Sequence, residues 1–299
     1  MTWLVLGANG QLGRALVRVL TSKEINHAAL GSTDLDIRDL DRCLSEINRR
    51  KPRVVVNAAA WTNVDGAEND PIATYSVNTQ GAVNLALAAK SIDSIFVQIS
   101  TDYVFSGVNE TPWEEKSATS PLSVYGFTKA RAEYRVLEEF ASGTYIFRTA
   151  WLYSPWGKNF AKTMTKLALR DDFEVRVVAD QIGQPTYAVD LAHQIVETIQ
   201  AKLPFDIYHA TNSSEASWFS FAQEVFNLSG QSTSRVLPIT SSDYLTAAKR
   251  PQYTVLGHEA WRQFGVEGQR VQPMRKWQDA LVQAMPEILN EVKREISND

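Results

Sequence analysis

The chain has 299 residues with a formal net charge of −4, and 44% of them are hydrophobic. No Lys- or Arg-rich stretch of the kind that binds nucleic acid stands out, so we expect no nucleic-acid partner. Cys43 is the only cysteine, which excludes an intrachain disulfide and a cysteine-rich metal site and is typical of a reducing compartment. No apolar run approaches the roughly 18 residues of a membrane span, and no signal peptide is evident, so we expect no membrane association and a cytoplasmic location.

Short apolar runs alternate with helix-periodic segments over the first half of the chain. The runs predict strands at Trp3–Leu6, Asn26–Leu30, Arg53–Asn57, Ser94–Ser100 and Thr144–Arg148. The segments between them predict helices at Leu12–Leu20, Leu40–Ile47, Pro71–Lys90 and Val124–Phe140. Strands that are apolar on both faces and separated by helices are typical of a covered parallel sheet. We therefore predict an α/β fold with a doubly wound parallel sheet.

The pattern is looser after Trp151, where the loops contain more Pro, Gly and Ser. It predicts strands at Glu174–Val178 and Asp206–His209, and helices at Phe160–Leu169, Ala188–Gln200, Trp218–Asn227 and Met274–Val292. We predict a sheet domain over residues 1–150 and a smaller lobe, mainly over 151–299, above the carboxyl edge of the sheet. The boundary is soft, because later segments are expected to return partly to the sheet.

A glycine-rich turn, Gly7-Ala8-Asn9-Gly10-Gln11-Leu12-Gly13, joins the first predicted strand to the first helix. Glycine there allows a tight turn, a close approach of a diphosphate and close packing of helix against strand. The helix N-terminus adds free N–H groups and a positive dipole end. A loop that merely contains glycines is the alternative. The position in a βαβ unit favours a Rossmann-type dinucleotide site, and the spacing is that of short-chain dehydrogenases.

No acidic residue follows the second strand at the place where one would bind the ribose of NAD. A 2′-phosphate would meet little repulsion there, which favours NADPH, with NADH possible; no arginine stands beside Ser32 to clamp that phosphate. Asp36 and Ile37 are placed to flank the adenine, although Asp36 could instead belong to a helix cap. The small residues around Ala60, after the third strand, would let the backbone lie near the cofactor or simply pack a helix on the sheet.

The candidate catalytic residues are Thr101, at the end of the fourth predicted strand, and Tyr125 and Lys129 on the following helix. Residues four apart share one helix face. An ammonium beside a phenol is expected to lower its pKa toward neutrality, which suits general acid–base work. A ketone between them would receive hydride at carbon and a proton at oxygen. Such a Tyr–Lys pair also occurs by chance on many helices, but here it accompanies the glycine turn in the right order.

These residues resemble the extended short-chain dehydrogenase/reductase superfamily and, within it, the dTDP-4-dehydrorhamnose reductase family. The similarity covers nearly the whole chain, in segments at residues 7–13, 56–65 (VNAAAWTNVD), 100–105 (STDYVF), 120–129 (SPLSVYGFTK), 147–153 (FRTAWLY), 159–164 (NFAKTM), 180–186 (DQIGQPT) and 249–251 (KRP). The resemblance implies reduction of dTDP-4-dehydro-β-L-rhamnose to dTDP-L-rhamnose, a sugar donor for cell-surface polysaccharide. It implies NADP(H) as cofactor and a dTDP-sugar as substrate.

The resemblance also implies roles for individual residues. Thr101, Tyr125 and Lys129 resemble the family's catalytic trio, and Thr101, Asp102 and Trp151 resemble its contacts to the sugar nucleotide. The expected cofactor contacts are Gly7, Gly10, Gln11, Leu12, Gly13, Asp36, Ile37, Ala60, Trp61, Thr62, Tyr125 and Lys129. Trp151 suits the apolar face of a deoxyhexose, with a core tryptophan as the alternative. Arg250 is expected to neutralise a diphosphate, with a surface ion pair as the alternative.

Some members of the family are dimers bridged by magnesium through glutamates. The matching positions here are Ala15 and Val189, so we predict no metal and a monomer or weak homodimer. Two other functions stay open. One is reduction of a related dTDP-4-keto sugar. The other is a non-catalytic regulatory subunit of the methionine adenosyltransferase type, which the intact trio argues against. A dehydratase would carry an acid where Tyr103 stands.

Overall fold

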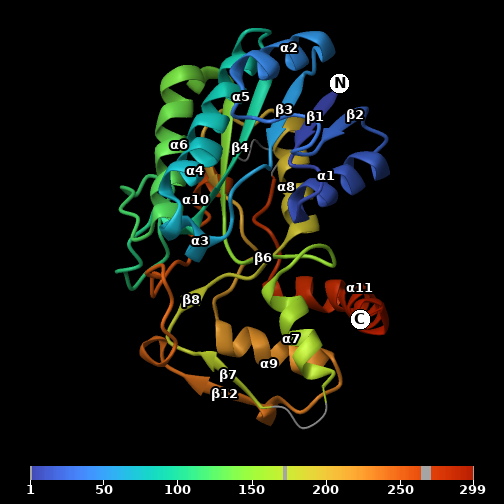
Figure 1. The fold of residues 1–299 in the computed structure, drawn as a ribbon, viewed down its shortest axis with the longest axis vertical. Coiled ribbons are helices and arrows are strands. Elements are labelled where there is room, and N and C mark those ends of the chain that lie inside the picture. Colours follow the sequence, from blue (N-terminus) through green and yellow to red (C-terminus); the bar gives the residue numbers. More distant parts are fainter. Residues whose placement is uncertain (1, 171–173, 264–270, 299) are drawn as a thin grey trace.

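The centre of the fold is a six-stranded parallel sheet, seen in a computed structural model that describes residues 2–170, 174–263 and 271–298 (Figure 1). Its strands are β1 Trp3–Leu6, β2 His27–Leu30, β3 Val54–Asn57, β4 Ile95–Thr101, β5 Thr144–Thr149 and β10 Ile207–His209. They lie in the order β10-β5-β4-β3-β1-β2. The predicted fold class is confirmed, and β10 shows that the second half of the chain returns to the sheet.

Helices cover both faces of this sheet (Figure 1). They are α1 Gln11–Ser22, α2 Leu40–Arg50, α5 Gly81–Lys90, α6 Val124–Phe140 and α8 Ala188–Gln200. Successive side chains of a strand point to opposite faces. Leu4 and Leu6 of β1 accordingly join the hydrophobic cluster under α2, α5 and α6. Trp3 and Val5 join the cluster under α1 and α8. Both faces of β1 are therefore buried, as its unbroken apolar run predicts.

The strand order reverses direction at β1. The chain passes from β1 to β2 on one side and then crosses to β3 on the other. Loops that leave the carboxyl ends of β1 and β3 therefore diverge, and an open α/β sheet binds its ligands in the crevice this creates. Leu6 is paired with Asn57 at this edge, so Gly7 and Ala58 begin the two diverging loops.

A C-terminal lobe lies beyond the carboxyl edge of the sheet (Figure 1). It contains α7 Phe160–Ala168, α9 Trp218–Leu228, α11 Trp277–Asn298 and the parallel pair β7 Val175–Val178 and β12 Val236–Ile239. Short strand pairs connect it to the sheet, formed by β6 Leu152–Tyr153 with β9 Thr186–Tyr187 and by β8 Ile182–Gly183 with β11 Ala216–Ser217. One hydrophobic cluster contains residues of both the sheet and this lobe. The division near residue 150 therefore stays a prediction.

The sequence patterns locate the long elements well and the short ones poorly. The predicted helix Pro71–Lys90 is interrupted: it comprises α4 Pro71–Tyr75, a π-helical turn Ser76–Gln80 and α5. The helices α3 Val64–Asn69 and α10 Glu259–Gln263 and the two-residue strands were not predicted, because segments so short show no period. Within the described ranges, no helix is long and apolar enough to cross a bilayer.

Gly13 gives a test of how tightly α1 packs on the glycine turn. A Cβ at Gly13 would lie 2.2 Å from the Gly7 carbonyl oxygen and 2.7 Å from the Ala8 Cα. Because both atoms belong to the backbone, we expect Gly13→Ala to lower the free energy of unfolding by about 1–3 kcal/mol in urea denaturation. Gly10→Ala is the matched control, since its nearest contact would be 3.3 Å. Equal urea midpoints for wild type and Gly13→Ala would contradict this packing.

Candidate active site

Two adjoining cavities open at the carboxyl edge of the sheet. The larger, of about 580 Å³, extends from the glycine turn to the C-terminal lobe. The predicted site residues that line it are Gly10, Gln11, Leu12, Ala60, Thr62, Thr101, Asp102, Tyr125, Lys129 and Trp151. The smaller, of about 360 Å³, is lined by Gly7, Gly10, Asp36, Ile37 and Ala60 among others. Most of the predicted site thus comes together around one continuous crevice.

The glycine turn is shaped to admit a large anionic ligand. Gly7 has a φ of 74°, and a Cβ there would lie 2.6 Å from Ala58, so a side chain would close the gap between the diverging loops. The N-cap of α1 is Gly10, and no side chain among the described residues caps this helix. Its first N–H groups and positive dipole end face the larger cavity, to which Gly10, Gln11 and Leu12 belong. These features fit a diphosphate.

The smaller cavity ends at the residues after β2. Ser32 lines it together with Asp36 and Arg38, and Arg38 binds Asp36 at 2.6 Å. The hydrogen bonds from Arg38 lower the pKa of the Asp36 carboxyl to about 2. No arginine neighbours Ser32 in the sequence, but the turn before α2 brings Arg38 to the same cavity. Its charge is shared with Asp36, so this end of the crevice is close to neutral.

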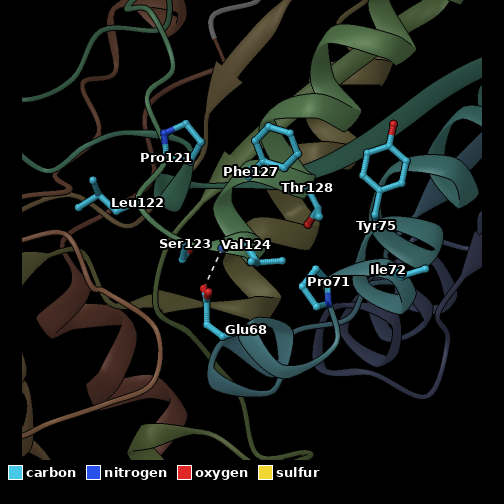
Figure 2. A pocket seen from close by; sticks show the side chains of 10 residues that line it. All are labelled: Glu68, Pro71, Ile72, Tyr75, Pro121, Leu122, Ser123, Val124, Phe127 and Thr128. Atoms are coloured by element: carbon cyan, nitrogen blue, oxygen red, sulfur yellow. Dashed lines mark hydrogen bonds between the residues drawn. The ribbon is translucent and has the colours of Figure 1, made fainter.

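Tyr125 lies in the first turn of α6, whose start is held from two sides. The Ser123 side chain accepts a hydrogen bond from Gly126 N at 3.2 Å, and the Glu68 carboxylate accepts one from Val124 N at 2.8 Å (Figure 2). The Tyr103 ring packs edge-on against Tyr125, with ring centroids 5.9 Å apart. Helix capping and this ring contact therefore fix where the phenol points.

Figure 2 also shows a separate pocket on the outer side of this helix start. It is lined largely by apolar groups, including Ile72, Val124 and Phe127, and Glu68 is its single ionisable carboxylate among the described residues. That carboxylate is used as a cap for α6. The pocket is distinct from the crevice that contains Thr101 and Lys129, and it holds none of the predicted site residues.

The expected electrostatic effect of Lys129 on Tyr125 is not what the structure contains. The Lys129 ammonium donates to the Ile99 carbonyl oxygen at 2.5 Å, and burial lowers the pKa of Lys129 to about 8. Burial also raises the pKa of Tyr125 to about 12, although the hydrogen bond with Thr101 opposes the rise; the residue as a whole is half-buried. The predicted fall in the phenol's pKa is thus wrong for this structure, because desolvation outweighs a charge that points elsewhere.

Thr101 and Asp102 follow directly from β4 into the cavity. The Thr101 hydroxyl donates to the Asp102 carboxylate at 3.0 Å and accepts a hydrogen bond from Tyr103 N at 3.2 Å. Asp102 is only 2% exposed, and burial raises its pKa to about 6, against hydrogen bonds from Thr254 and Thr101 that lower it. The crevice therefore holds a hydroxyl, a phenol and a carboxyl group that titrates close to neutral pH.

The π-helical turn explains how the loop after β3 is held. Its Asn78 is buried; its side chain accepts from Trp61 N at 2.8 Å and donates to Trp61 O and to Thr128 Oγ1, each at 3.1 Å. One extra residue in the turn brings this amide to face both the loop and α6, as π-bulges at functional sites often do. Asn78 thus joins the predicted cofactor loop to the helix of Tyr125, and no sequence motif pointed to it.

Three of the predicted site residues do not line either cavity. Gly13 is buried behind the turn, and the Trp61 indole donates to Asn63 O at 3.1 Å. Arg250 binds Asp65 at 2.7 Å and lines a different hollow, so the ion pair considered as the alternative is present. A diphosphate contact from Arg250 and cofactor contacts from Gly13 and Trp61 stay predictions.

Trp218 lines the cavity, whereas its sequence pattern predicts only the start of a helix. Its indole stacks on Trp151 with ring centroids 3.6 Å apart and an angle of 9°, and the Phe160 ring also packs against it, tilted, with centroids 4.7 Å apart. Trp151 has a φ of 45°, which is uncommon for a residue with a Cβ. Trp218 lies far beyond Trp151 and Phe160 in the sequence, so spacing could not reveal the stack. Both indoles form an apolar wall of the cavity.

The chain matches a known family over most of its length. The family described as RmlD substrate binding domain matches residues 1–290. The chain belongs to this family. It is 41% identical over 298 residues to a dTDP-4-dehydrorhamnose reductase of Streptomyces griseus, covering 98% of this chain and 96% of that one. It is 41% identical over 285 residues to a dTDP-4-keto-6-deoxy-D-glucose reductase of Streptomyces niveus, covering 95% and 96%.

A solved structure of the same family has the same overall shape. The dTDP-4-dehydrorhamnose reductase of Bacillus anthracis, in complex with NADP, superimposes with a TM-score of 0.90 at 34% sequence identity, covering 96% of this chain and 99% of that one. The family's fold therefore includes both the sheet and the C-terminal lobe. In the described part of this chain, no group of three or more His, Cys, Asp or Glu is placed to hold a metal ion.

Asn78 offers a test of the link between the loop after β3 and α6. Asn78→Ala would leave Trp61 N, Trp61 O and Thr128 Oγ1 without this partner inside the protein. We expect the free energy of unfolding to fall by about 2 kcal/mol or more in urea denaturation. Asn48→Ala, which removes one exposed bond to Leu44 O, is the control and should change it by less than about 0.5 kcal/mol. Equal effects of the two variants would show that Asn78 holds nothing in place.

Proposed function

We propose that this protein reduces the C4 ketone of dTDP-4-dehydro-β-L-rhamnose to dTDP-L-rhamnose with hydride from NADPH. The observation that carries the proposal is that Thr101, Tyr125 and Lys129 line the same cavity as the first turn of α1. A proton donor and a diphosphate site then share one crevice. The two relatives of this chain at 41% identity are described as reductases of dTDP-4-dehydrorhamnose and of a dTDP-4-keto sugar. They support the proposed reaction class and a nucleotide sugar as the substrate.

The bound cofactor would supply the hydride, and this chain's residues would supply the proton and the orientation. With a pKa raised by burial, Tyr125 is a neutral phenol at physiological pH and can give its proton to the oxygen of a ketone that is being reduced. Thr101 can donate a second hydrogen bond to the same oxygen once its hydroxyl proton turns from Asp102. To stabilise the phenolate that Tyr125 becomes, the Lys129 ammonium would turn from Ile99 O, its partner in this structure, toward the phenol. Thr101 and Lys129 are buried and Tyr125 is half-buried, which limits the access of water.

The cofactor is placed by the features that admit a diphosphate. The turn at Gly7 and the free N–H groups of α1 would hold the diphosphate, with the adenosine end in the cavity beside Ile37. We favour NADPH over NADH because Ser32 and Arg38, rather than an unpaired carboxylate, stand at that end. The Bacillus anthracis relative in complex with NADP is consistent with this choice.

The sugar would lie against the apolar wall of the cavity. The Trp151–Trp218 wall suits the apolar face of a deoxyhexose, and the dTDP-4-keto-6-deoxy-D-glucose reductase relative keeps a related substrate open. Tyr103, with a pKa raised further by burial, cannot serve as the ionised base that a dehydratase needs. The relatives of 41% identity are described as reductases, which argues against a non-catalytic regulatory subunit. We further propose a cytoplasmic enzyme that acts as a monomer or weak homodimer.

Replacement of Tyr125 tests the function directly. Tyr125→Phe keeps the ring and its packing against Tyr103 but removes the proton. We expect kcat to fall by about 10²–10⁴-fold in an assay that follows NADPH consumption with the dTDP-keto sugar. NADPH binding, measured by calorimetry, should persist. Turnover that survives this change would show that another group gives the proton.

The lowered pKa of Lys129 predicts the pH dependence. The ammonium is present below a pKa of about 8 and is lost above it. Because only the ammonium can stabilise the Tyr125 phenolate, we expect kcat/KM to decline above about that pH with the slope of a single ionisation. Enzyme held at alkaline pH and assayed again at neutral pH controls for denaturation. A rate that stays level well into the alkaline range would contradict the assigned role of Lys129.

A further inference from the structure

A buried ion pair lies behind the site, and the proposed reaction does not use it. Arg148 on β5 and Glu133 on α6 are 2% and 4% exposed, and they meet through two hydrogen bonds of 2.9 and 2.7 Å. Taking two charges out of water costs about as much as their attraction returns, so such a pair is weak evidence for stability. An apolar pair would have filled the same space. The position of this pair therefore needs another explanation.

The Arg148 guanidinium contacts several groups besides the Glu133 carboxylate. It donates to Glu115 O at 3.0 Å, lies 3.3 Å from His209 Nε2, and stands 5.0 Å over the Phe105 ring. Burial, and then the charge of Arg148, keep the pKa of His209 well below its usual value, so His209 stays neutral. Glu133 is thus anchored by a cation that is itself fixed to β5, β10 and the loop after β4.

Glu133 is one helical turn beyond Lys129, on the same face of α6. The charge of Glu133 raises the pKa of Lys129 and opposes the desolvation that lowers it. Charged groups on the other elements packed against α6 are engaged elsewhere. On α3, Asp65 binds Arg250 and Glu68 caps α6, while Lys90 of α5 donates to Glu139 O at the far end of the helix. Of the remaining titratable neighbours, Tyr75 of α4 lines the separate pocket of Figure 2, and the Tyr145 hydroxyl of β5 donates to Leu203 O. Asp102 and Tyr103 after β4 and Tyr125 on α6 line the crevice.

We propose that Glu133 is a positioning residue whose buried carboxylate keeps the Lys129 ammonium protonated at neutral pH, while Arg148 holds that carboxylate in place and offsets part of its charge. The proposal rests on the proposed function, because it gives Lys129 the role of countering the Tyr125 phenolate. It makes opposite predictions for the two members of one ion pair. Loss of the carboxylate should make Lys129 harder to protonate, and loss of the guanidinium should not.

The test compares pH profiles of Glu133→Gln and Arg148→Gln. In Glu133→Gln, the alkaline limb of kcat/KM should move to lower pH by roughly one unit, the size of shift that a nearby buried charge produces. In Arg148→Gln, the limb should stay in place or move to higher pH. Glu133→Asp keeps the charge and should recover most of the wild-type profile. Asp190→Asn controls for general destabilisation. It breaks a different ion pair, between Asp190 and Arg275 at 2.8 Å, and should leave the alkaline limb unmoved.

A second readout does not depend on turnover. NMR titration of isotope-labelled lysine in the cofactor-free protein, with the Lys129 signal identified by its loss in Lys129→Arg, should show the same direction of change. If the wild type has no reductase activity, the proposed function fails while this titration still tests the ion pair. If a single variant does not fold, the double variant Glu133→Gln/Arg148→Gln can replace it, because it lacks both buried charges. Its alkaline limb of kcat/KM should still lie at lower pH than that of the wild type. An unmoved limb in Glu133→Gln, or equal downward shifts in both single variants, would overturn the proposal.

Discussion

The structure depends on the divergence of two neighbouring parallel strands. Because β1 and β3 are paired in register but their loops leave in opposite directions, the carboxyl edge of the sheet opens into a crevice that no side chain fills. The glycine turn forms one wall of this crevice. Thr101, at the end of β4, and Trp151, after β5, belong to its other walls. The helix of Tyr125 is fixed by its own caps and by Asn78, so the groups that meet there are set by the sheet and by few local contacts.

Burial determines the chemistry of these groups more than their mutual charges do. The same desolvation moves the pKa values of a phenol and an ammonium in opposite directions. It raises the pKa of Tyr125, which keeps its proton, and lowers the pKa of Lys129, which loses its proton more easily. For a reduction this is the useful direction, since the phenol must arrive protonated. The buried Glu133–Arg148 pair lies where it can limit the loss of charge on Lys129, which connects the interior of the α/β layer to the reaction at its edge.

The sequence predicts what depends on nearby residues. The glycine turn and the Tyr–Lys spacing are local patterns, and the structure brings them to one crevice. Contacts between distant segments could not be predicted in the same way. The stacking of Trp151 on Trp218 and the pairing of Arg250 with Asp65 depend on how the C-terminal lobe folds back. The pKa of Tyr125 was predicted in the wrong direction, because a four-residue spacing shows that Lys129 shares its helix face but not that its ammonium bonds to Ile99 O.

The central claim is that a reduced nicotinamide and a sugar ketone meet in the crevice beside Tyr125. The most direct measurement uses NADPH with deuterium at both hydrogen positions of the reactive carbon of the nicotinamide, and the dTDP-4-keto sugar as substrate, and locates the label by NMR of the products. We predict one deuterium bound to C4 of the product sugar and one retained on the oxidised cofactor. Product without deuterium at C4, or label at a different carbon of the sugar, would contradict the central claim.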